Sequence, residues 1–162
     1  MIALLVLLVT AVLGACVYER LRYHADLTHQ MPVLAKAIHF YHHSYDALPP
    51  SVRAIEARGS MGRGACRLPR NGWESWQEHS GPEVLYVPVV DWDGETAYVI
   101  AVQPPIGRSV RLYLVAGDTS VHQATEADLA KILARDDELR AATGQPGRWD
   151  QVPWRSPVAG AP

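Results

Sequence analysis

The chain has 162 residues, of which 15 are Lys or Arg and 17 are Asp or Glu, so its formal net charge is -2. This balance lacks the strong excess of basic residues that is typical of nucleic-acid-binding proteins, and we expect no nucleic-acid partner. The two cysteines, Cys16 and Cys66, have none of the close spacings of a metal site, and the sequence predicts no cofactor.

The first predicted element is an apolar run from Ile2 to Tyr18, which carries no charged side chain. Its length is at the short end of what crosses the hydrocarbon core of a bilayer, and it is apolar on every side. We therefore predict a transmembrane anchor over 1–18 in a chain that crosses the membrane once. A secretory signal peptide is an alternative, but basic residues precede its apolar core, and only Met1 precedes this run.

The end of the run allows a second interpretation. Leu13-Gly14-Ala15-Cys16 is a stretch of small residues that ends in Cys, which is typical of the processing site of a bacterial lipoprotein. In that case Cys16 carries a lipid, and the protein is an envelope lipoprotein whose small domain binds a ligand or another protein.

A helical pattern over 19–48 continues directly from the apolar run, and Pro49-Pro50 predicts its end. Pro32 lies inside the pattern and predicts a kink. Apolar residues recur every three or four positions and form one stripe, which we expect to pack on the domain and to hold subunits together. The members of this stripe are Leu27, Met31, Leu34, Ile38, Tyr41 and Tyr45.

Three histidines, His39, His42 and His43, share one turn of this predicted helix, a spacing that suits a divalent metal ion. No carboxylate or thiol partner is evident beside them, so we interpret them as part of a solvated polar face.

The middle of the chain predicts a short helix after Ser51, a Gly-rich loop over 59–81 and a sheet over 84–124. The sheet is expected to be an antiparallel meander of β-branched and aromatic strands separated by turn residues. The predicted strands are Val84 to Val90, Thr96 to Val102, Val110 to Val115 and Ser120 to Ala124.

The sequence Asp91-Trp92-Asp93-Gly94-Glu95 lies between the first two predicted strands. Asp93-Gly94 indicates a tight hairpin, since both residues tolerate positive φ. Asp91 and Asp93 also begin like a calcium-binding loop, but the later ligands of such a loop are missing, so we predict no metal site here.

The last predicted element is a helix over 125–143, with Thr125 as N-cap and Gly144 as terminator. The remaining residues, 145–162, are rich in Pro and Gly and predict a flexible tail. Residues 19–144 then form one globular domain of the α+β class, in which a long N-terminal helix packs on a small antiparallel sheet and a second helix follows.

No arrangement of residues predicts catalysis. Cys66 and His79 have the residue types of a nucleophile and a base, but they lie in the Gly-rich loop with no third group. We expect a protein that is not an enzyme and that has no small-molecule substrate.

Two segments resemble type IV pilin-like proteins and type II secretion pseudopilins. The first runs from Ala35 to Pro50, where a Tyr-containing helix end precedes a polar turn and a Pro pair. The second runs from Val110 to Leu133, where strands joined by a Gly/Asp turn lead into an acidic-capped helix. Together they cover about a quarter of the chain.

The resemblance implies a structural subunit of a type II secretion or type IV pilus-like assembly. Its expected partners are the membrane, other pilin-like subunits and secretion machinery. It also implies a place in the bacterial inner membrane with the domain on the periplasmic or extracellular side, whereas Arg20 and Arg22 after the run favour the cytoplasm. Family members have a basic leader and then Phe-Thr-Leu-x-Glu, which this sequence lacks, so we expect either a start further upstream or a relative that no longer polymerises.

Overall fold

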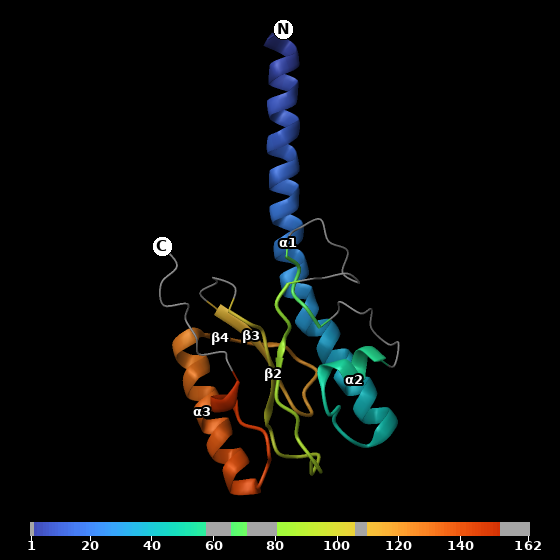
Figure 1. The fold of residues 1–162 in the computed structure, drawn as a ribbon, viewed down its shortest axis with the longest axis vertical. Helices are drawn as coiled ribbons and strands as arrows, with labels where there is room; N and C mark the ends of the chain where they lie inside the picture. Colours follow the sequence, from blue (N-terminus) through green and yellow to red (C-terminus); the bar gives the residue numbers. More distant parts are fainter. Residues whose placement is uncertain (1, 58–65, 71–80, 106–109, 153–162) are drawn as a thin grey trace.

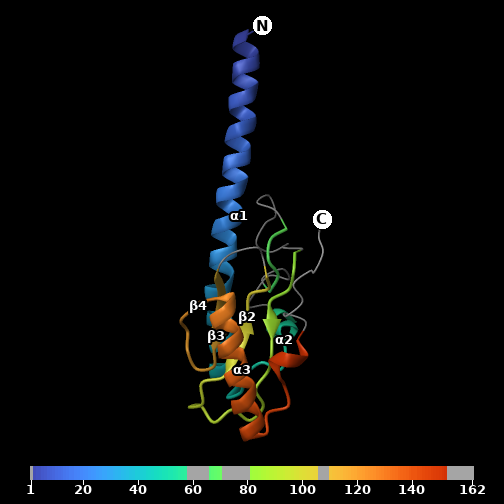
Figure 2. The same cartoon turned by 90° about the vertical axis from the view of Figure 1, so that its left-hand side faces the viewer.

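The structure is a computed structural model that describes residues 2–57, 66–70, 81–105 and 110–152 (Figure 1). Its fold belongs to the α+β class, as the sequence predicts: a four-stranded antiparallel sheet is combined with helices, one of which follows the last strand. The long N-terminal helix and the C-terminal helix lie on opposite sides of the sheet (Figures 1 and 2).

Helix α1 runs without a break from Ile2 to Tyr45 and is 44 residues long, which corresponds to about 65 Å. Its first half extends away from the rest of the protein, and its second half packs on the domain (Figure 1). Pro32 lies inside the helix. Asp46 has a positive φ of 53°, so the chain leaves the helix just before Pro49 and Pro50.

Within the part of the chain that the structure describes, no helix is both long enough and apolar enough to cross a membrane. The side chains of α1 are described from Val6 onward, with gaps at 23–24 and 26–27.

A short helix, α2 (Val52–Ala57), follows the Pro pair. The Ser51 hydroxyl accepts a hydrogen bond from the backbone N–H of Ala54 at 3.2 Å, which caps the helix as predicted. Much of the predicted loop over 59–81, including Trp73 and Trp76, lies outside the described residues. The described part contains Leu68, whose side chain is fully buried.

The sheet has the strand order β1-β2-β3-β4, which confirms the predicted meander. Each strand pairs with its neighbour in antiparallel fashion. The strands are β1 (Leu85–Tyr86), β2 (Val99–Val102), β3 (Val110–Val115) and β4 (His122–Thr125).

Asp93-Gly94 lies in the connection between the antiparallel strands β1 and β2, and Gly94 has the expected positive φ of 81°, but the predicted tight hairpin is wrong. The first pairs between β1 and β2 are Leu85 with Val102 and Tyr86 with Ala101, so a long connection separates the two strands. The Asp93 carboxylate accepts hydrogen bonds from the backbone N–H groups of Glu95 at 2.9 Å and Thr96 at 2.8 Å. This local turn satisfies backbone donors that a hairpin would have used for strand pairing.

Two separate cores cover the two faces of the sheet. On one face α1 and α2 pack against Ile100 and Leu114, and on the other face α3 packs against Val99 and Val102. All four residues of β2 are buried, as expected for a strand that is covered on both sides. A register shift between Val99 and Ala101 allows neighbouring residues to face both cores.

Helix α3 (Glu126–Thr143) has the predicted ends. The Thr125 side chain accepts a hydrogen bond from the backbone N–H of Asp128, and Gly144 has a left-handed φ of 73°. A one-turn 3-10 helix, η1 (Trp149–Gln151), follows.

The prediction of a flexible tail from residue 145 is wrong for residues 145–152. Trp149 is fully buried in the core beneath α3, and the Asp137 carboxylate accepts hydrogen bonds from the backbone N–H groups of Trp149 at 2.5 Å and Asp150 at 3.0 Å. The large apolar ring and these bonds outweigh the polar composition around it. Residues 153–162 lie outside the described residues.

A buried ion pair joins this segment to the sheet. The Arg140 Nε donates to the Asp136 carboxylate at 2.6 Å, and both side chains are almost completely buried. The other Arg140 nitrogens donate to backbone carbonyls of Val87, Pro88, Val99 and Gly147.

The Asp136 carboxylate also has hydrogen-bond partners other than Arg140. It accepts from the Trp149 indole N–H at 2.9 Å and from the backbone N–H of Val99 at 2.8 Å. A buried pair with this many satisfied partners is costly to break, because removal of one charge leaves the other uncompensated.

We therefore predict that Arg140→Met lowers the free energy of unfolding by about 3–5 kcal/mol. The measurement is urea unfolding of the full chain in mild detergent, followed by Trp fluorescence. Arg135→Met, at an exposed position of the same helix, is the matched control and should change stability by less than about 0.5 kcal/mol. Equal effects of the two substitutions would contradict the role of the buried pair.

Candidate functional site

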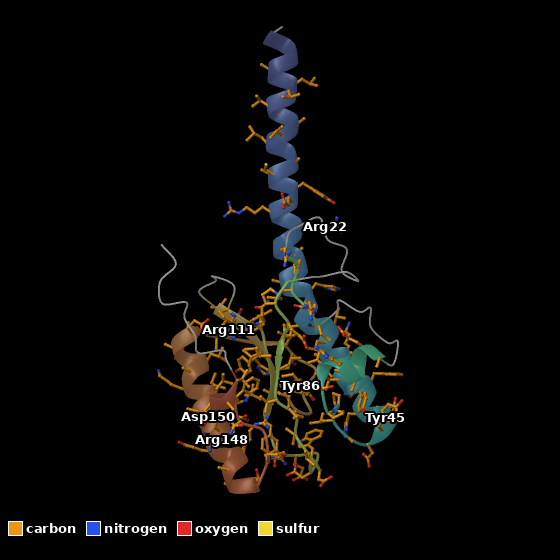
Figure 3. The ribbon with its side chains drawn as sticks, viewed as in Figure 1. Arg22, Tyr45, Tyr86, Arg111, Arg148 and Asp150 are labelled. Atoms are coloured by element: carbon orange, nitrogen blue, oxygen red, sulfur yellow. The ribbon has the colours of Figure 1, made fainter. Side chains whose placement is uncertain are left out.

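The most distinctive surface of the protein is the first half of α1. Its large apolar side chains are 48 to 70% exposed and project from the helix in several directions (Figure 3). A single soluble molecule rarely leaves so much contiguous apolar surface in water, so this region has the properties of a contact surface. We call it the apolar half of α1; it consists of Val6, Leu7, Leu8, Val9, Val12, Leu13, Val17, Tyr18 and Leu21.

Small residues interrupt this surface and would allow another helix to approach closely. Ala11, Gly14 and Ala15 are all exposed, and no heavy atom lies within 4 Å of the position that a Cβ on Gly14 would occupy. The Thr10 hydroxyl donates within its own helix, to the carbonyls of Val6 at 3.0 Å and Leu7 at 2.9 Å. The surface therefore exposes little unsatisfied polarity, as helix contacts in lipid require.

The predicted apolar stripe lies in the second half of α1, which packs on the domain. Met31, Leu34 and Ile38 are buried in the core between α1 and the sheet, whereas Tyr41 is half-buried and Tyr45 is 46% exposed. The side chain of Leu27 lies outside the described residues. The expectation that the stripe packs on the domain is therefore confirmed for these three buried members, Met31, Leu34 and Ile38. Its role in holding subunits together stays a prediction.

The three histidines of α1 differ in exposure, although His39 and His42 line the same small cavity beside Trp92. His39 and His43 are exposed, while the His42 ring lies edge-on to Trp92 with 5.1 Å between the ring centres. Among the described residues there is no group of three or more His, Cys, Asp or Glu side chains placed to hold a metal ion.

The two candidate aspartates for calcium, Asp91 and Asp93, both belong to the turn between β1 and β2. The side-chain and backbone hydrogen bonds from Thr96 hold the pKa of the Asp93 carboxyl below its usual value. Asp91 is exposed and has a positive φ of 47°, a backbone conformation that Asp tolerates better than most residues.

The two cysteines lie in opposite environments. Cys66 is buried, and its thiol contacts the backbone carbonyl of Val52 with 3.9 Å between sulfur and oxygen. Burial raises the pKa of the Cys66 thiol far above its usual value, and the Glu56 carboxylate adds to the increase. Cys16 is exposed in the apolar half of α1. His79, the base considered for Cys66, lies outside the described residues.

A shallow groove of about 200 Å³ lies between the start of α2 and β1. Its lining includes Pro50, Arg53, Glu83 and Tyr86. The Tyr86 hydroxyl donates to the carbonyl of Pro49 at 2.7 Å, and burial raises the pKa of Tyr86. The hydroxyl therefore serves to hold the chain after α1, which is a structural role.

Sequence reasoning missed the buried polar residues of the domain. Asp136, Asp137, Arg140 and Arg111 are all buried, and the Arg111 Nε donates to the carbonyl of Gln103 at 2.7 Å. The spacing of four residues between Asp136 and Arg140 was a signal for an ion pair on one helix face. Burial of that pair depends on Trp149, which the pattern of the tail did not reveal.

Comparison of the chain with protein-family models, with curated proteins and with solved structures gives no match.

The position of Cys66 generates a prediction about its reactivity. In a Cys16→Ser chain, we expect a thiol reagent at pH 8 to modify Cys66 at least about a hundredfold more slowly in the folded protein than after unfolding, because the thiol is buried and protonated. The measurement is the rate of absorbance change with a disulfide reagent. Fast modification in the folded state would contradict a structural role and would reopen the nucleophile interpretation.

Proposed function

We propose that the protein is a non-enzymatic, membrane-anchored pilin-like subunit and a structural component of a type II secretion or type IV pilus-like assembly. The observation that carries this proposal is the apolar half of α1, which is exposed in the single chain and continues directly into a helix built into the domain. An exposed apolar helix of this kind can attach a domain to apolar surroundings, such as a lipid bilayer or the helices of other copies.

The resemblance of Ala35 to Pro50 and of Val110 to Leu133 to pilin-like proteins supports the same function. The fold agrees with that resemblance in general terms, since a long N-terminal helix packs on an antiparallel meander. Fold alone does not imply function, so the exposed helix carries more weight.

Membrane attachment is part of the proposal and is assigned to the whole run from Ile2 to Tyr18. The exposed apolar side chains lie on more than one side of this helix (Figure 3). Lipid can cover them all, and the α1 helices of neighbouring copies can replace lipid on part of the surface. In this arrangement Arg22, which Figure 3 places where α1 leaves the domain, lies near the boundary with water.

In this proposal the chain contacts the bilayer only through α1, so that the whole domain is on one side of the membrane. We propose the bacterial inner membrane as the location, with the domain on the periplasmic or extracellular side, because the pilin-like resemblance implies it.

A single charge introduced into the apolar half of α1 tests the proposal. Leu13→Glu should shift the full chain out of the membrane fraction of a bacterial host after an alkaline wash, because a carboxylate in a bilayer costs about 3 kcal/mol. Leu13 is 60% exposed, so the folded domain should keep its Trp fluorescence. Arg135→Glu on the exposed face of α3 is the control. If Leu13→Glu and the parent chain stay equally in the membrane fraction, the anchoring role is wrong.

Intact mass of the membrane-bound parent chain distinguishes the alternative. An unlipidated chain that still contains the residues before Cys16 agrees with the pilin-like proposal. A chain that begins at a lipidated Cys16 would contradict it and favour an envelope lipoprotein with a small binding domain.

A further inference from the structure

The outer face of α1 carries a second exposed surface, at the level of the domain. Phe40, the single phenylalanine of the chain, is 61% exposed. His29, Lys36 and His43 recur with it at spacings of seven, four and three residues, and all three are exposed. We call these four residues the outer face.

The outer face points away from its own domain. Residues two positions apart on an α-helix are separated by about 200° around the axis. Since His42 contacts Trp92 on the domain side, Phe40 projects from the opposite side of the helix. The whole helical stretch from Thr28 to Ser44 contains no Asp or Glu, so this side of α1 carries only neutral or basic groups.

A complementary surface lies at the end of the domain opposite the N-terminus, in the connection between β1 and β2, which reaches the C-terminal end of α1 through Trp92 (Figure 1). We call the segment from Val90 to Thr96 the end turn. Asp91, Asp93 and Glu95 are exposed in it, and it contains no basic residue. Val90 is 50% exposed, so this surface also combines one apolar side chain with charges of a single sign.

The end turn is held in shape without help from another molecule. The Gln145 side chain makes hydrogen bonds to both the N–H and the carbonyl of Val90, each at 2.8 Å. The Trp92 indole donates to the carbonyl of Thr96 at 2.8 Å, and Asp93 accepts from the backbone of the turn. The cost of ordering this loop on binding is therefore small.

We propose that the outer face of one copy docks on the end turn of a second copy. Phe40 meets Val90 at the centre of the contact, and Lys36 lies opposite the carboxylates of the turn, Glu95 among them. Because the two surfaces are different parts of the same chain, the contact is head-to-tail and repeats from copy to copy. This inference rests on the proposed function and adds to it the domain contact between neighbouring subunits.

Charge reversal tests the contact. The full chain is placed in neutral phosphatidylcholine vesicles, and energy transfer between dyes on Ala142→Cys, in a Cys16→Ser background, measures association of copies. Lys36→Glu alone and Glu95→Lys alone should each weaken association about fivefold, because each makes one pair of charges repulsive. An equimolar mixture of the two variants should restore it, since every contact between unlike copies is then attractive.

Lys131→Glu and Glu138→Lys, both on the exposed face of α3, are the matched controls and should change nothing alone or mixed. Unchanged association in the single variants, or a mixture that does not recover, would overturn the proposed contact. In either case, chains that still bind the vesicles leave the proposed function intact, whereas chains that do not bind them contradict that function itself.

Discussion

The structure depends on the burial of the second half of α1 against the sheet. Met31 and Leu34 are fully buried, and Ile38 is nearly so. These side chains attach a helix of 44 residues to a small domain, although less than half of the helix touches it. A helix held so firmly at one end presents its other end in a defined direction, and the apolar half of α1 extends away from the domain for that reason (Figure 2).

The other face of the sheet is covered by a separate core. Helix α3 and Trp149 cover that face, and the Asp136–Arg140 pair joins both of them to β2. Burial of an ion pair is not in itself stabilising, but this pair donates to four backbone carbonyls and accepts from one backbone N–H and one indole N–H. The result is one sheet with an independent core on each face.

The elements with strong local signals could be predicted from the sequence. The caps of α3 at Thr125 and Gly144, the end of α1 before Pro49 and the order of the strands all depend on neighbouring residues. The errors involve contacts between distant residues: Asp93 forms a local turn because β1 and β2 pair further away, and Trp149 is buried only because α3 and the sheet form a cavity that fits it. Periodicity placed Met31, Leu34 and Ile38 on one face but did not distinguish a domain core from a subunit contact.

We propose above all that the apolar half of α1 packs against other copies in a membrane. Single cysteines placed in turn from Val6 to Leu21, in a Cys16→Ser chain reconstituted in vesicles, test it by oxidative cross-linking. Contact along one side of a helix predicts that the cross-linked dimer is strongest at positions three or four residues apart and weak between them. Absence of cross-links at every position, or equal cross-linking at all of them, would contradict the claim.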